Sequence, residues 1–172
     1  MKQVFLTFTT LLVLVTSKNA NAQTTNAAMV SSAGIQQALL LSSESSKIDA
    51  ADITMTAVKD FQASFKSVTH QQWYEVSDGF IAEFTKDKIP TRVAYDKKGR
   101  WHCTVRTLNE TQLPADVRDL VKSRYYDFNI LVAYEIKHEN TAYVLKIEDS
   151  KTLKMLRVVD GEIEVITDNT KE

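Results

Sequence analysis

Residues 79–108 read GFIAEFTKDKIPTRVAYDKKGRWHCTVRTL, and they carry the clearest secondary-structure pattern of the chain. Phe80, Ala82 and Phe84 alternate with other side chains, and this period of two is typical of a β-strand. The Lys-Lys-Gly run that ends at Gly99 is a turn signal, because glycine adopts backbone angles that other residues avoid. The stretch therefore predicts antiparallel strands joined by tight turns.

Residues 100–106, RWHCTVR, show the same alternation of apolar and polar side chains most clearly. Alternation of this kind is typical of a strand with one buried and one wet face. We therefore expect one set of side chains to point inward and the other outward. The inward set is Trp101, Cys103 and Val105, and the outward set is Arg100, His102, Thr104 and Arg106.

Two amphipathic helices are predicted, one before each group of four strand-like runs. Apolar residues at helical spacing mark them both. In the first helix these residues are Val58, Phe61 and Phe65, and in the second, which starts at Pro114, they are Val117, Leu120, Val121 and Tyr125. The two halves align with an offset of about 60 residues, which is typical of an internal repeat. We expect an α+β fold of two tandem helix-plus-four-stranded antiparallel repeats within residues 52–168, with halves of about 52–108 and 110–168.

The first 22 residues have the three regions of a secretory signal peptide. Lys2 supplies the positive start, residues 4–15 are mostly apolar, and Ala-Asn-Ala at 20–22 is a small-residue cleavage site. The apolar run is too short to span a bilayer. The signal peptide has no cysteine after its apolar run, so a lipoprotein anchor is not expected. We expect cleavage after Ala22, a periplasmic or secreted product, and no membrane span in that product.

Residues 23–51 are rich in Ser, Thr, Ala and Asn, and this composition predicts a flexible spacer. One apolar island interrupts it, IQQALLL at residues 35–41. The sequence leaves three interpretations open for this island: a loosely attached linker, a short helix, or a strand that docks on the domain.

Composition removes several classes of function. The chain has 21 basic and 22 acidic residues, and loss of Lys2 and Lys18 with the signal peptide leaves a net charge of −3. A nucleic-acid partner is not expected, because such proteins usually carry a basic excess. The single cysteine, Cys103, cannot form an internal disulfide, and its place in the alternation predicts a buried thiol. We find no catalytic motif, no metal-ligand spacing and no cofactor fingerprint, so no enzyme, metal or cofactor is predicted.

Several short motifs resemble the secreted PepSY-like family, also described as β-lactamase-inhibitor-like (BLIP-like). The motifs are Phe80-Ile-Ala-Glu-Phe84, the hairpin Tyr95-Asp-Lys-Lys-Gly99 and the helix start Leu113-Pro-Ala-Asp-Val117, and they occur in the family's order. The resemblance covers about two thirds of the mature chain. It implies a non-enzymatic binding role, and most members have no assigned activity. It does not imply that this protein binds a β-lactamase.

The outward set suggests a basic, partly flat sheet face without a helix. We expect Arg100, His102 and Arg106 on it, together with Arg92 of the preceding strand and Tyr74 of the first. Arginine is enriched at protein interfaces because its planar group makes paired hydrogen bonds. The resulting hypothesis is an exported binding protein whose helix-free face holds a protein or peptide partner in the cell envelope. The alternatives are a small-molecule or stress sensor with a pocket between the halves, an envelope enzyme with an unrecognised site, or a merely solvated face.

Overall fold

The computed structural model describes residues 46–171 of the chain. It contains two α-helices, two short 3-10 helices and nine strands within this range. In chain order the elements are β1 (Ser46–Ile48), η1 (Ala50–Asp52), α2 (Met55–Ser64), β2 (Thr69–Val76), β3 (Gly79–Lys86), β4 (Ile89–Asp96), β5 (Trp101–Leu108), η2 (Glu110–Gln112), α3 (Ala115–Arg124), β6 (Asn129–Lys137), β7 (Thr141–Glu148), β8 (Thr152–Val159) and β9 (Glu162–Thr170).

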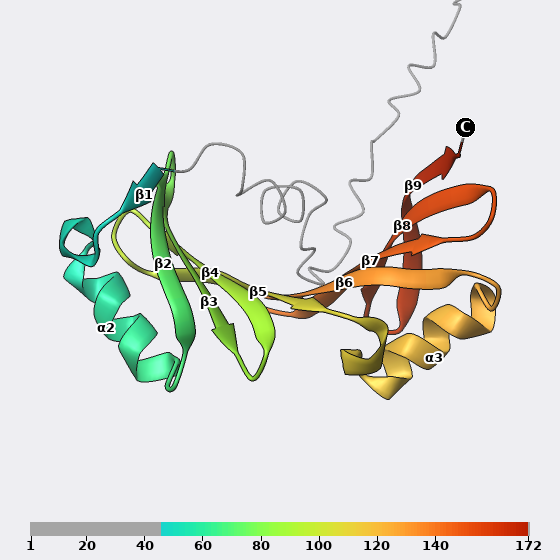
Figure 1. The fold of residues 1–172 in the computed structure, drawn as a ribbon, viewed down its shortest axis with the longest axis horizontal. Helices are drawn as coiled ribbons and strands as arrows, with labels where there is room; N and C mark the ends of the chain where they lie inside the picture. Colours follow the sequence, from blue (N-terminus) through green and yellow to red (C-terminus); the bar gives the residue numbers. More distant parts are fainter. Residues whose placement is uncertain (1–45, 172) are drawn as a thin grey trace, which may run out of the picture.

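All nine strands pair in a single antiparallel sheet, and their spatial order is their order in the sequence. Both α-helices lie on the same side of this sheet, α2 near one end and α3 near the other (Figure 1). The antiparallel sheet is confirmed, and each helix precedes four strands as expected. The strands form one continuous sheet rather than two separate ones, so the division into two repeats stays an interpretation. The two faces of the sheet are called here the helix face and the helix-free face.

Each helix covers a core on the helix face. Beneath α2, Phe61 packs on Trp73 of β2 and Phe84 of β3, with ring centroids 5.3 and 5.1 Å apart. The core beneath α3 is mainly aliphatic. It contains Leu108, Val117, Val121, Ala133, Leu145, Ile147 and Leu156. The centre of the helix face, between the two helices, is left open.

The start of α3 follows directly from the sequence. Pro114 precedes its first turn with φ −53°, the value that the proline ring imposes. Asp116 lies in the first turn, whereas Lys122 and Arg124 lie in the last. These charges oppose the partial charges of the helix ends and stabilise the helix.

The orientation of β5 corrects a prediction. Cys103 and Val105 are buried as expected, but they point to the helix-free face. Thr104 was expected outside and is buried on the helix face, opposite Val93 of the α2 core. Trp101, expected inside, is 40% exposed. Alternation separates the two faces of a strand but does not say which face the helices cover.

The folded region begins earlier than predicted. Ser46–Ile48 forms β1, which pairs with β2, and Ala50–Asp52 forms η1. The end of the predicted spacer, residues 46–51, is therefore structured. The signal peptide at 1–22 and the apolar island at 35–41 lie outside the described residues.

Candidate functional site

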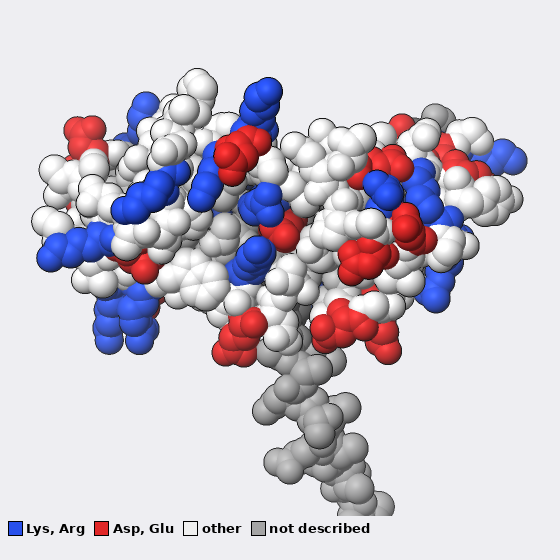
Figure 2. Space-filling view, turned by 90° about the horizontal axis from the view of Figure 1, so that it is seen from below, with Lys and Arg blue, Asp and Glu red and all other residues white. Residues whose placement is uncertain are grey.

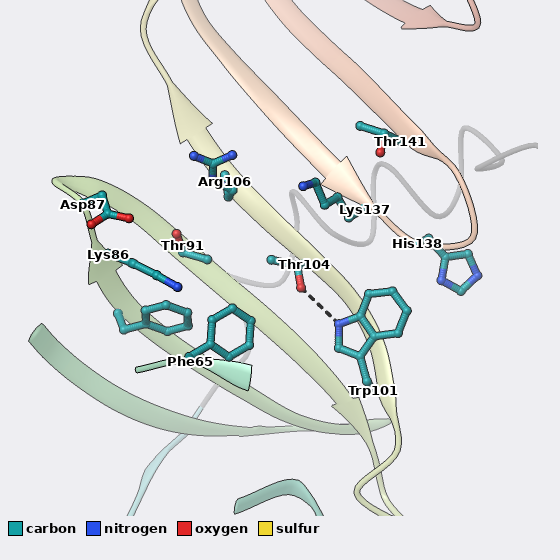
Figure 3. Close-up of a pocket in the computed structure, with 11 residues that line it drawn as sticks. Phe65, Lys86, Asp87, Thr91, Trp101, Thr104, Arg106, Lys137, His138 and Thr141 are labelled. Carbon is teal, nitrogen blue, oxygen red and sulfur yellow. Dashed lines mark hydrogen bonds between the residues drawn. The ribbon is translucent and has the colours of Figure 1, made fainter. Parts of the chain in front are cut away.

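A cavity of about 500 Å³ opens at the centre of the helix face, between the two helices. We call it the Trp101 pocket (Figure 3). Its walls come from the end of α2, the β3–β4 turn, β5 and the β6–β7 turn. The lining residues are Phe65, Phe84, Lys86, Asp87, Thr91, Trp101, Thr104, Arg106, Lys137, His138 and Thr141.

Aromatic side chains form part of the wall. Phe65 and Phe84 lie with ring centroids 4.9 Å apart. The indole Nε1 of Trp101 donates a 3.0 Å hydrogen bond to the hydroxyl of Thr104 (Figure 3). This bond fixes the indole orientation while leaving the ring partly open to solvent. The pocket therefore presents an oriented, accessible aromatic surface.

Arg106 is held by a buried carboxylate. Its Nη1 lies 2.7 Å from Oε2 of Glu135, whose side chain is 7% exposed. The hydroxyl of Tyr143 donates to the other Glu135 oxygen at 3.3 Å. Burial, with the nearby Glu135 charge as the next cause, raises the pKa of Tyr143 to about 12. Arg106 is thus a positioned cation, because its partner is itself fixed on the neighbouring strand β6.

His138 lines the pocket and contacts a second histidine, His102. The rings of His102 and His138 lie 5.0 Å apart, and His138 lies 6.2 Å from the Trp101 ring. Nδ1 of His138 donates to the backbone carbonyl of His102. This bond ties the β6–β7 turn to the start of β5. No sequence pattern pairs these histidines, which are 36 residues apart.

Cations outnumber anions among the residues that line the pocket. Lys86, Arg106 and Lys137 face a single acid, Asp87. Lys86 Nζ also lies 6.0 Å from the centroid of the Phe65 ring, at the limit of a cation–π contact. Figure 2 views the molecule from the helix side and shows Lys and Arg side chains near the middle of this face, beside acidic ones. The lining chemistry suits a ligand with an anionic group and an apolar part.

Comparison with solved structures identifies the architecture. A BLIP-like protein from Bacteroides fragilis superimposes with a TM-score of 0.57 at 17% identity, over 69% of this chain and 86% of that one. A DUF2874 family protein from Bacteroides ovatus superimposes with a TM-score of 0.58 at 14% identity, over 69% of this chain and 87% of that one. The chain has the BLIP-like fold. The resemblance inferred from the sequence motifs is confirmed at the level of the fold.

A third solved structure shares the BLIP-like fold. It is a Bacteroides eggerthii protein provisionally described as periplasmic, with a TM-score of 0.56 and 11% identity, over 69% of this chain and 88% of that one. No protein-family model matches the chain, and neither does any curated protein. The described helices include none that is long and apolar enough to cross a membrane. Within residues 46–171, no group of three or more His, Cys, Asp or Glu side chains is placed to hold a metal ion.

The BLIP-like sheet separates the five residues predicted for one face. Arg106 lines the Trp101 pocket, and the ring of His102 lies 5.0 Å from that of His138, which also lines it. Arg100 precedes Trp101 and is bound to Asp96, with Nη2 2.6 Å from Oδ2. Tyr74 and Arg92 lie on the helix-free face, where all five residues were expected.

Strand register places Arg92 and Tyr74 on the far side. Arg92 lies opposite Val105, a helix-free position, and forms an ion pair with Glu83 at 2.9 Å. Tyr74 lies opposite Ile81 on that same face. The prediction of one shared basic face is therefore wrong. Side chains one residue apart on a strand point to opposite faces. Arg106 pairs with Thr91 and Arg92 pairs with Val105, so Arg106 and Arg92 lie on opposite faces of the sheet.

Sequence reasoning missed most of the pocket. Lys86, Lys137 and His138 come from turns or strand ends that meet only in the folded sheet. Trp101 was assigned to the core because it alternates with Cys103. The register shift between Ala94 and Tyr95 breaks that alternation at the start of β5, so that Trp101 pairs with Tyr95. No signal in a single sequence reports such a shift.

Proposed function

We propose that the protein is an exported, non-catalytic binding protein whose Trp101 pocket holds an acidic segment of a protein or peptide partner. The observation that carries the proposal is the accessible Trp101 indole in a pocket that also contains positioned Arg106. Tryptophan and arginine are the side chains most enriched among residues that dominate binding energy at interfaces. The site differs from the helix-free face expected from the sequence, but the class of function is the same.

The charges of the pocket favour an acidic partner. Arg106 is oriented by Glu135, so little further ordering is needed when it binds an anion. Its guanidinium can donate to a second acceptor as well as to Glu135, because it carries five N–H donors in a planar arrangement. Lys137 lies 4.0 Å from Glu135 and keeps half of its side chain exposed. A partner carboxylate placed between these two cations would gain charge-assisted hydrogen bonds.

Export of the protein is supported by two independent observations. Residues 1–22 have the regions of a signal peptide. A solved structure with the same fold is provisionally described as periplasmic. The partner is therefore proposed to be a protein or peptide of the cell envelope.

The polar groups of the pocket support binding rather than catalysis. The Thr104 hydroxyl accepts from Trp101, and the Thr91 hydroxyl donates to the carbonyl of Ile89 at 3.1 Å. Nδ1 of His138 donates a hydrogen bond to the backbone carbonyl of His102. The thiol of Cys103 lies on the other face, and burial raises its pKa to about 11. No nucleophile among these groups is paired with a base, so we assign no chemical step to the site.

A peptide-binding experiment tests the proposal. Labelled peptides that combine Asp or Glu with one bulky apolar residue would be titrated with the protein and compared by fluorescence anisotropy with peptides of reversed charge. We expect acidic peptides to bind, and Trp101→Ala and Lys137→Gln each to weaken binding about tenfold or more. Tyr126→Ala is the matched control, because Tyr126 is 82% exposed and lies outside the pocket lining. Equal binding of acidic and basic peptides, or unchanged binding by Trp101→Ala, would contradict the proposal.

The size of the pocket favours one second candidate, a small anionic ligand. Its volume of about 500 Å³ lies within the range of small-molecule sites. This corresponds to the sensor alternative, which expected a pocket between the two halves. A thermal-shift screen of small carboxylates and phosphates separates the two candidates. Stabilisation that Lys137→Gln removes, combined with no peptide binding, would favour the small ligand.

A further inference from the structure

An apolar stripe crosses the middle of the helix-free face. Register places its members side by side on neighbouring strands, with Ala94 opposite Cys103 and Val105 opposite Ile136. We define the apolar stripe as Ala94, Cys103, Val105, Ile136, Val144 and Met155. It runs from β4 to β8, at the centre of the sheet.

The stripe is buried although no described helix lies over it. The exposed fraction is 6% for Cys103, 1% for Ile136 and 0% for Val144. Both α-helices lie on the opposite side of the sheet (Figure 1). An antiparallel sheet face that meets water is normally polar, because an uncovered apolar face loses the free energy of burial. The stripe therefore has the composition and the burial of a covered face.

The chain itself supplies an apolar segment that is close in sequence to β1, at the edge of this sheet. Described structure begins at Ser46 in β1, so residues 1–45 enter the fold from that edge of the sheet. Residues 35–41, IQQALLL, contain four large aliphatic side chains within a stretch otherwise dominated by Ser, Thr, Ala and Asn. The exported chain would keep this segment, because it follows the predicted cleavage site.

The segment is also long enough to reach the stripe. Leu41 precedes Ser46 by five residues, which span about 17 Å when extended, and Ile35 can reach about 37 Å. Strand β5 lies four strand spacings from β1, or about 19 Å along the sheet. Residues 35–41 can therefore lie over β4 to β7, where the stripe is.

We propose that residues 35–41 bind the apolar stripe and cover the helix-free face of the same molecule. Ile35, Leu39 and the two following leucines meet aliphatic side chains there, and this removes apolar surface of both from water. An external partner for the helix-free face would have to displace this segment. The inference is independent of the Trp101 pocket, which lies on the other face.

Cys103 provides a direct probe of this cover, because it is the only cysteine of the chain and belongs to the stripe. The experiment measures how fast N-ethylmaleimide labels Cys103 in the native full chain. The test variant is Leu39→Asp with Leu41→Asp. The matched control is Ser42→Asp with Ser43→Asp, which adds the same charge to the neighbouring residues. We expect the test variant to label about tenfold faster or more, and the control to label like the wild type.

Three outcomes would overturn the proposal. The first is wild-type labelling in the Leu39→Asp, Leu41→Asp variant. The second is faster labelling that simply follows the unfolded fraction, measured by circular dichroism in a urea series. The third is protection of Cys103 that weakens on dilution of the wild type, which would assign the cover to a second copy of the chain.

A cross-link gives an independent measurement that tolerates a loss of stability. Single variants Leu39→Cys, Leu40→Cys and Leu41→Cys would be oxidised at low protein concentration. We expect at least one to form an intramolecular disulfide with Cys103, because a covering segment brings their Cβ atoms within bonding range. The control Ser31→Cys lies before the apolar island and should remain reduced. Absence of the disulfide in all three leucine variants would contradict the proposal.

Discussion

The two helix-covered cores differ in composition although their elements follow the same order. The core under α2 is rich in aromatic residues and contains Phe61, Trp73 and Phe84, whereas the core under α3 consists mainly of Leu, Val and Ile. The aromatic core also supplies Phe84 to the wall of the Trp101 pocket. The same element order therefore allows different packing, and the pocket forms where the aromatic core meets the open centre of the sheet.

The largest expected effects come from truncating one residue in each core. Phe61 and Leu145 are both at least 98% buried. We expect Phe61→Ala to lower the free energy of unfolding by about 4 kcal/mol and Leu145→Ala by about 3 kcal/mol, because each leaves a cavity and loses burial. Urea unfolding followed by circular dichroism and by Trp73 fluorescence, in a Trp101→Phe background that removes the second tryptophan, gives both values.

The same experiment tests whether the two cores are one unit. The shared sheet predicts that Leu145→Ala shifts the Trp73 transition together with the overall transition, although Trp73 lies in the other core. Two separate transitions would show instead that each core unfolds on its own and would favour the interpretation of two repeats.

Two glycines at corresponding positions of the halves give the next effect. Both have positive φ, +77° at Gly99 and +79° at Gly161. A Cβ at Gly99 would lie 2.5 Å from the Thr54 hydroxyl oxygen and 2.7 Å from the backbone nitrogen of Ala57, whereas nothing lies within 4 Å at Gly161. We expect Gly161→Ala to cost about 1–2 kcal/mol from backbone strain alone. Gly99→Ala should cost about 3 kcal/mol or more, because α2 must also shift.

Thermal unfolding of the two alanine variants measures this difference. A larger loss of stability in Gly99→Ala than in Gly161→Ala would show that the β4–β5 turn packs against α2, whereas the β8–β9 turn has no such contact at Gly161. Equal losses would mean that backbone strain is the whole cost and that α2 adapts to the new side chain.

Ion pairs on the two faces provide a third comparison. Glu135 is buried beside Arg106, but Glu83 and Arg92 are both more than a third exposed. We expect Glu135→Gln to lower the free energy of unfolding by about 2 kcal/mol, since it leaves Arg106 without its anion. Glu83→Gln should cost about 0.5 kcal/mol or less, because water screens the exposed pair. Chemical denaturation at low and high salt measures both, and a salt-dependent loss in Glu135→Gln would contradict the buried pair.

These comparisons show which parts of the fold the sequence could predict. Pro114 and Val117 mark the start of α3, and the alternation of Phe80, Ala82 and Phe84 marks β3 and its buried face. Such features are local, because a backbone angle or a period of two depends only on neighbouring residues in the sequence. Strand β1 was missed, since three residues, Ser-Lys-Ile, are too few to show a period.

The site was harder to predict because it depends on the position of β5 in the sheet. Cys103 and Thr104 are adjacent and both buried, so β5 is covered on its two faces. The alternation around Cys103 predicts only one buried face for β5, and it therefore places Arg106 outside. The cover on the helix face comes from residues distant in sequence, and the Trp101 pocket is assembled in the same way. A single sequence carries no record of these distant contacts.

Alkaline pH compares a tyrosine in the core under α2, Tyr95, with one that packs against the core under α3, Tyr143. Tyr95 donates to Asp60 of α2 at 3.0 Å, and burial with this acid raises its pKa far above the ordinary 10.0. The pKa of Tyr143 is raised less, to about 12. Because the folded state holds each proton more tightly than the unfolded state, their contributions are complete below pH 10 and are lost as the pH rises through the folded pKa.

Tyr95→Phe and Tyr143→Phe should therefore flatten the alkaline loss of stability, the former more than the latter. At neutral pH each substitution should cost only about 1 kcal/mol, the value of one hydrogen bond. Urea unfolding at a series of pH values from 7 to about 12, where Tyr143 begins to ionise in the folded state, gives the slopes, and the rising ionisation of Cys103 is common to all variants and cancels. A steeper alkaline loss in Tyr95→Phe than in Tyr143→Phe would contradict this prediction, because it would show that the folded state holds the Tyr143 proton more tightly than the Tyr95 proton.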